Sequence, residues 1–256
     1  IGFGGRAIDS NDNPKYLNSP ESKVFRKKNN LYGLNLSRAS VGKEGFIILV
    51  EGYMDTISLY QGGITNVVAS LGTALTENQS HLIKRYTKDV VLSYDSDSAG
   101  IAAAIRGMEI LHNEGLKVKI IKISGGKDPD ELIRNEGREA FRKLVENALS
   151  FGDYKLNYIK SKYNLKDDDS RIECIKEIAE SLSKLGAVEQ DIYIKKVSKE
   201  LSVSEAALRI EINKTQSGHE QTRGRSEGSN ESLEELSSIE KNCLRLITIN
   251  ESYIQK

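Results

Sequence analysis

Four short apolar runs, separated by helical stretches, constrain the fold of this chain more than any other feature of its sequence. The runs span residues 46–50, 66–70, 89–94 and 118–123. They are nearly continuous in apolar character, which is typical of strands covered on both faces. Because strands and helices alternate, we expect an α/β fold in which helices flank a parallel sheet. The functional site of such a fold lies at the carboxyl ends of the strands.

The composition changes on either side of this α/β segment and predicts five regions. Residues 1–45, rich in Gly, Asn, Ser and Lys, should form loops and short strands, and 46–137 the α/β domain. Residues 138–212 keep a helical period and predict a helical subdomain. Residues 213–232 hold no aliphatic or large aromatic side chain and predict a flexible linker. Apolar periodicity returns in 233–256, which we interpret as the start of a further domain.

Composition also excludes several classes of protein. The 256 residues hold 37 Lys and Arg against 37 Asp and Glu, and no apolar run is long enough to cross a membrane. Two distant cysteines exclude a disulfide scaffold and a Cys-rich zinc site, so a reducing cytoplasm is the expected compartment. The chain begins at Ile1 rather than Met, so we expect a piece of a longer protein.

Acidic side chains follow three of the four predicted strands. In a parallel sheet these strand ends converge on one edge, where unpaired carboxylates repel one another unless cations bind them. Magnesium takes carboxylates, waters and substrate phosphates as ligands, so the pattern predicts metal-assisted phosphoryl chemistry. The six acids are Glu51, Asp55, Asp95, Asp97, Asp128 and Asp130.

A helix cap or a turn is the alternative role for each acid taken alone. Asp128 is the best example, because Pro129 and Glu131 follow it as in the first turn of a helix. Residues 76–79 likewise form a predicted capping box. Glu51, Asp95 and Asp97 together favour metal binding instead.

Residues 1–45, which we call the basic arm, carry eight Lys and Arg against four Asp and Glu. Basic and amide side chains at Arg6, Lys15, Asn18 and Lys27 alternate with the aromatic residues of the arm. Cations neutralise nucleic-acid phosphates and aromatic faces stack on bases, so the arm is a candidate for single-strand binding. An ordinary solvated surface loop is the alternative.

Several segments of the chain resemble the DnaG-type bacterial DNA primases. Glu51-Gly-Tyr-Met-Asp55, the segment 94–100 and Lys127-Asp128-Pro-Asp130 are similar to the motifs of the toprim domain. The toprim domain also occurs in topoisomerases, nucleases and recombination mediators. The segments at 2–6, 14–20, 30–34 and 69–74 resemble primase in particular.

This resemblance implies an α/β toprim domain inside the core of a DNA-directed RNA polymerase, which makes short RNA primers on single-stranded DNA by metal-dependent nucleotidyl transfer. It implies that Glu51, Asp95 and Asp97 are catalytic and that all six acids take part in binding Mg²⁺ or Mn²⁺. It further implies that Arg6, Lys15, Asn18 and Lys27 contact the template and the incoming ribonucleoside triphosphate.

The resemblance also implies partners and missing parts. A zinc-ribbon domain and the first part of the polymerase core would precede residue 1, so zinc is expected only there. A domain that binds the replicative helicase would begin at 233–256, and the protein would act in the bacterial cytoplasm at the replication fork. A toprim-type nuclease and a non-enzymatic recombination mediator are the alternative functions.

Overall fold

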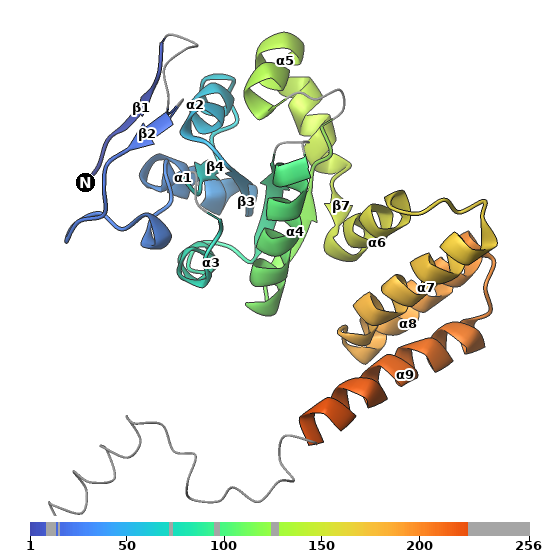
Figure 1. The fold of residues 1–256 in the computed structure, drawn as a ribbon. Helices are drawn as coiled ribbons and strands as arrows, with labels where there is room; N and C mark the ends of the chain where they lie inside the picture. Colours follow the sequence, from blue (N-terminus) through green and yellow to red (C-terminus); the bar gives the residue numbers. More distant parts are fainter. Residues whose placement is uncertain (9–13, 15, 72–73, 95–97, 124–127, 225–256) are drawn as a thin grey trace, which may run out of the picture. The chain divides into compact units, whose positions relative to one another are not determined.

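The computed structural model describes residues 1–8, 14, 16–71, 74–94, 98–123 and 128–224 (Figure 1). Within these ranges only the backbone is described for 98–99 and 216–224. The chain divides into two compact units, Ile1–Lys162 and Tyr163–Lys256. Among the described helices, none is long and apolar enough to span a membrane.

The first unit is built on a five-stranded sheet in the order β4-β3-β5-β6-β7. Parallel pairing joins β4 (Val67–Ala69), β3 (Phe46–Val50), β5 (Asp89–Ser93) and β6 (Lys117–Ile120), which confirms the predicted fold class. The fifth strand, β7 (Leu149–Ser150), is antiparallel to β6 at the edge. Its two residues were too few to give a period of two against the helical pattern around them.

Helices cover both faces of the sheet. On one face, Ile47 and Leu49 of β3 pack with α1 (Leu34–Glu44), α3 (Glu77–Lys84) and α4 (Ser98–Asn113). On the other, Ile48 and Val50 pack with α2 (Tyr53–Gln61) and α5 (Pro129–Glu146). Burying one side chain of this size contributes roughly 1.5–3 kcal/mol. The near-continuous apolar strands are therefore explained by burial on both sides.

The basic arm holds more regular structure than its composition predicts. Strands β1 (Gly4–Arg6) and β2 (Tyr16–Asn18) pair antiparallel, and a short 3₁₀ helix, η1 (Lys27–Asn29), follows. The prediction of loops and short strands alone was wrong for α1. Only Ser37 and Val41 of that helix are buried, so it leaves almost no apolar period in the sequence.

The unit boundary lies later than the predicted boundary at 137. Helix α5 continues to Glu146 through a kink at Gly137, whose φ is 78° and ψ −178°. Helix α6 (Phe151–Ser161) also belongs to the first unit, because Phe151 packs against the core of the sheet. The predicted helical subdomain therefore begins in the first unit and continues into the second.

The second unit consists, in its described part, of α7 (Asp168–Ser183), α8 (Ala187–Leu201) and α9 (Glu205–Gly224). Buried side chains such as Ile178, Ile194 and Leu208 hold these helices together. Helix α9 runs past residue 213, where the linker was predicted to start, because residues without apolar side chains can still be good helix formers. Residues 225–232 and the predicted further domain at 233–256 lie outside the described residues.

Candidate active site

Glu51 stands where two neighbouring parallel strands end. It follows β3 directly, and the register pairs Val50 at the end of β3 with Ser93 at the end of β5. Tyr94, the next residue after β5, is buried, and burial raises the pKa of its hydroxyl, with the charge of Glu51 adding to the effect. Glu51 is thus close to the end of β5. The predicted site residues Asp95 and Asp97 follow that end but lie outside the described residues.

Asp55 lies in the first turn of α2, four residues after Glu51. A Cβ atom at Gly52 would come within 2.9 Å of Asp55 Oδ2, so the missing side chain leaves room for this carboxylate beside the backbone that carries Glu51. The amino end of a helix also favours a negative charge. A turn that carries two carboxylates, with a glycine directly after the first, fits a hard divalent cation, which prefers oxygen ligands.

Asp128 and Asp130 have partners within the protein. Asp128 caps α5, because its Oδ1 accepts a hydrogen bond of 2.6 Å from the backbone N–H of Glu131. Asp130 is only 8% exposed, and its carboxylate accepts hydrogen bonds from Ser58 Oγ and, at 2.7 Å, from Arg134 Nε. The cap role of Asp128 is confirmed, and Asp130 joins α5 to α2.

Four of the six acids lie among the described residues, and these four do not form one closed cluster. No group of three or more His, Cys, Asp or Glu side chains there could hold a metal ion. Glu51 and Asp55 are brought together at one strand–helix junction, and Asp128 and Asp130 at the amino end of α5.

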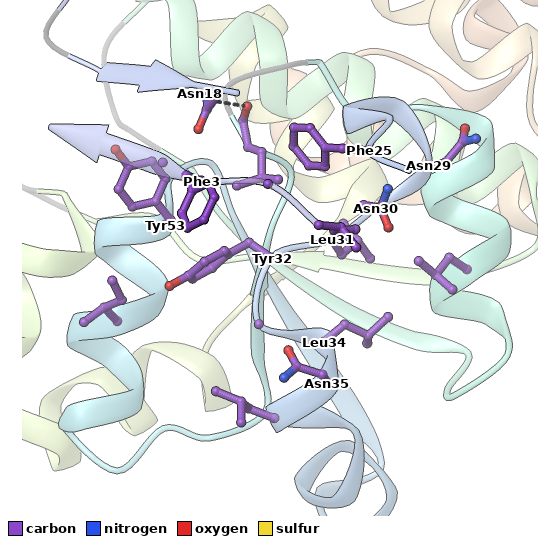
Figure 2. Close-up of a pocket in the computed structure, with 18 of the residues that line it drawn as sticks. Phe3, Asn18, Phe25, Asn29, Asn30, Leu31, Tyr32, Leu34, Asn35 and Tyr53 are labelled. Atoms are coloured by element: carbon purple, nitrogen blue, oxygen red, sulfur yellow. Dashed lines mark hydrogen bonds between the residues drawn. The ribbon is translucent and has the colours of Figure 1, made fainter. Parts of the chain in front are cut away.

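The predicted arm residues lie on the β1–β2 pair and on η1. Arg6 ends β1, and its guanidinium carbon lies 5.6 Å from the centre of the Tyr16 ring opposite it on β2. Asn18 donates from Nδ2 to the carbonyl of Leu71, 3.4 Å away, just after β4 (Figure 2). Lys27 begins η1, and Lys15 lies outside the described residues.

Gln79 fixes η1 against the α/β domain, a role that the sequence did not reveal. The predicted capping box is present, since Thr76 Oγ1 accepts a hydrogen bond from the Gln79 N–H and Gln79 Oε1 accepts one from the Thr76 N–H. The fully buried side chain also donates from Nε2 to the carbonyls of Lys27 at 3.1 Å and Asn30 at 2.9 Å. The capping pattern was the only signal, and it could not show what the amide group holds.

A hollow of about 1110 Å³ is lined by the β1–β2 pair, η1 and helices α1 and α2. Figure 2 shows aromatic and amide side chains around it, and Arg6 and Arg38 add positive charge to its lining. Side chains of this kind can stack on bases and bind phosphates. The labelled lining residues include Phe3, Asn18, Phe25, Tyr32 and Tyr53.

Comparison with known proteins identifies the family. A model described as Toprim-like matches residues 48–133, and the model of the DNA primase catalytic core, N-terminal domain, matches residues 1–38. The model of the DnaB-helicase binding domain of primase matches residues 153–206. A crystal structure of a DNA primase domain from Pseudomonas aeruginosa is 33% identical, with a TM-score of 0.69, and the match covers 83% of this chain and 68% of that one. The chain belongs to the DnaG-type bacterial DNA primase family.

Two further members of the family show how much of the length of a known primase the chain covers. A DNA primase of Clostridium acetobutylicum is 55% identical over 209 residues, which are 81% of this chain and 35% of that relative. A solved DnaG primase catalytic domain bound to single-stranded DNA is 34% identical, with a TM-score of 0.68, and the match covers 81% of this chain and 67% of that one. The chain therefore spans about a third of the length of that curated relative and about two thirds of the solved domain.

The partners of Asp130 predict that this carboxylate stabilises the fold. Asp130→Asn leaves the buried site without its charge and weakens the pair with Arg134, whose side chain is 60% exposed. We expect the free energy of unfolding to fall by about 1–3 kcal/mol, less than for a fully buried pair because solvent screens Arg134. Urea denaturation measures this change.

Asp128→Asn is the matched control, because asparagine caps a helix about as well as aspartate. Its free energy of unfolding should stay within about 0.5 kcal/mol of the wild type. Equal stability of the Asp130 variant and this control would contradict a structural role for Asp130.

Proposed function

We propose that this chain is part of the catalytic core of a bacterial DNA primase and serves in the synthesis of short RNA primers on single-stranded DNA. The observation that carries the proposal is the position of Glu51 at the paired ends of β3 and β5, in a chain whose first 38 residues match the primase core model. The reaction is a DNA-templated nucleotidyl transfer from ribonucleoside triphosphates. We assign it to the bacterial cytoplasm, at the replication fork.

The acidic edge is the proposed site for Mg²⁺ or Mn²⁺. Glu51, Asp95 and Asp97 are the proposed catalytic acids, with Asp55 as a further ligand at the junction of β3 and α2. A bound divalent cation supplies positive charge that neutralises the triphosphate and the pyrophosphate that leaves. Asp128 and Asp130 are proposed as outer members of this metal-binding set. Their carboxylates already accept hydrogen bonds within α5, from the Glu131 N–H and from Arg134.

The basic arm is the proposed contact for phosphates of the template and the incoming nucleotide. Arg6 and Asn18 lie at opposite corners of the β1–β2 pair, and Lys27 lies on η1, which Gln79 holds in place. Lys15 joins this set by its match to the family motif. The similar primase domain that was solved with single-stranded DNA supports this choice of partner.

The replicative helicase is the proposed protein partner. The helicase-binding model matches residues 153–206, which lie upstream of the 233–256 segment expected to begin the helicase-binding domain. We therefore include this helical stretch in the proposed contact. We assign zinc to the zinc-ribbon domain of the family and not to the residues of this chain.

A toprim nuclease and a recombination mediator are less favoured. Both would account for acids at the strand ends, but neither accounts for the match of residues 1–38 to the primase core.

Replacing Glu51 tests the proposed metal site. In a primase core that contains this chain, Glu51→Gln should lower primer synthesis by at least about 100-fold, the usual effect of losing one charge-stabilising group. Folding should be unaffected, because the change keeps the volume and removes repulsion between carboxylates. Incubation with single-stranded template, ribonucleotides and magnesium measures the RNA product, and thermal unfolding measures the fold.

Glu139→Gln, an exposed substitution on α5, is the matched control and should leave synthesis unchanged. A well-folded Glu51 variant with normal RNA yield would exclude the proposed role of Glu51. Nicking of DNA in place of RNA synthesis would favour the nuclease.

Replacing Lys27 tests the proposed phosphate contacts of the arm. If Lys27 neutralises a single-strand phosphate, Lys27→Ala should flatten the slope of log affinity against log salt concentration by about 0.7. The affinity should fall about equally for all sequences, because phosphates carry no sequence information. Salt titration of fluorescent oligonucleotide binding measures the slope.

Lys23→Ala is the control within the same arm, since Lys23 is exposed and no family motif assigns it a role. Identical slopes for the wild type and both variants would rule out Lys27 as a phosphate contact.

A further inference from the structure

Tyr53 lies between the two acids of the β3–α2 junction and reaches toward the basic arm. It follows Glu51 by two residues and precedes Asp55 by two, at the first position of α2. The side chain is 9% exposed, and its hydroxyl donates a hydrogen bond of 2.6 Å to the carbonyl of Gly5. Gly5 is the middle residue of β1 and precedes Arg6 directly. One hydrogen bond thus joins the acidic junction to the strand that carries Arg6.

The Tyr53 ring adds a packed contact to this hydrogen bond. The ring of Tyr16 meets it edge-on, with centres 5.7 Å apart, and the ring of Tyr32 lies 5.9 Å away. Figure 2 shows Tyr53 and Tyr32 side by side beneath the β1–β2 pair. Tyr16 is also the ring beneath the Arg6 guanidinium. A continuous line of contacts therefore runs from Arg6 through Tyr16 to Tyr53.

Gly4 shows how closely the arm approaches Tyr53. A Cβ atom at Gly4 would lie 3.0 Å from Tyr53 Cε1 and 3.2 Å from Asn18 Oδ1, closer than ordinary van der Waals contact. At the adjacent Gly5 a Cβ atom would meet nothing within 4 Å. A side chain at Gly4 would therefore collide with the Tyr53 ring, whereas a side chain at Gly5 would have open space around it.

The β1–β2 pair depends on such an anchor. Each strand has three residues, and an isolated two-stranded pair of this length is marginal in water. The hydrogen bond from Asn18 to the Leu71 carbonyl is long, at 3.4 Å, whereas the Tyr53 bond is short. Tyr53 also belongs to a small apolar cluster with Phe25 and Leu71, which fixes its ring.

We propose that Tyr53 is a positioning residue that holds the phosphate-binding side chains of the arm in register with the metal-binding acids. Because Arg6 and Asn18 are phosphate contacts only under the proposed function, this role rests on that function. Glu51 and Asp55 are held by β3 and α2 themselves, so Tyr53 sets the place of the arm and not that of the acids. Its loss should therefore weaken nucleotide binding and spare both metal binding and the chemical step.

Tyr53→Phe tests this role, because it removes only the hydroxyl group. In a primase core that contains this chain, we expect the KM for the nucleoside triphosphate to rise about 3- to 10-fold, which corresponds to one neutral hydrogen bond. The kcat should stay within about twofold, and the affinity for Mn²⁺ alone should be unchanged. Amide hydrogen exchange in residues 4–6 and 16–18 should become faster. Tyr60→Phe is the control, since Tyr60 lies on the same helix and is 38% exposed.

A second pair of variants approaches the contact from the arm. Gly4→Ala pushes β1 away from the Tyr53 ring and should raise the KM in the same way, whereas Gly5→Ala should not. An unchanged KM in Tyr53→Phe and Gly4→Ala would overturn the proposal. A lowered kcat together with weaker Mn²⁺ binding would also overturn it, because Tyr53 would then support the acids.

The proposed function and the positioning role fail in different ways. If the function is wrong, the wild-type core makes no RNA from template, ribonucleotides and magnesium. If only the positioning role is wrong, the wild-type core is active and the Tyr53→Phe and Gly4→Ala variants keep its KM.

Discussion

The parallel pairing of β3 with β5 is the constraint on which the rest of the site depends. Their register sets Val50 beside Ser93, so the residues that follow both strands leave the sheet at the same edge. Both strands are buried on two faces, and a slip by one residue would exchange the Ile47 and Ile48 faces between two different sets of helices. Packing on both sides therefore fixes the edge at which Glu51 stands.

The acids at the sheet edge and the basic side chains of the arm are held in place in different ways. Carboxylates at the sheet edge stay in place because the strands and the first turn of α2 carry them, even though they repel one another. The β1–β2 pair and η1 have no such support of their own, and contacts with the α/β domain hold them in position. Gln79 holds the backbone of η1, and Tyr53 holds that of β1. These hydrogen bonds, and not electrostatic attraction between basic and acidic side chains, set the distance between the arm and the acids.

Strong local patterns made most of this fold predictable from the sequence. The four apolar runs gave the parallel sheet, and residues 76–79 gave the start of α3. Helix α1 was missed because few of its side chains are buried, and the two-residue β7 because it is too short to show a period. The end of α9 was misplaced because a polar helix lacks an apolar stripe.

The site was less predictable than the fold, because its contacts join residues far apart in the sequence. The position of Glu51 follows from strand order, but the pair of Asp130 with Arg134 and Ser58 depends on how α5 packs on α2. Neither the Gln79 contact with η1 nor the Tyr53 contact with Gly5 has a local signature, since the partners are backbone carbonyls.

We propose that the ends of β3 and β5 form one cation site, and a crystal of this chain soaked in manganese is the decisive test. Anomalous scattering at the manganese edge locates the ion independently of any activity. We expect a peak at the carboxyl ends of β3 and β5, with an oxygen of Glu51 among the ligands of the ion. A fully occupied manganese peak elsewhere, with Glu51 bound only to protein groups, would contradict it.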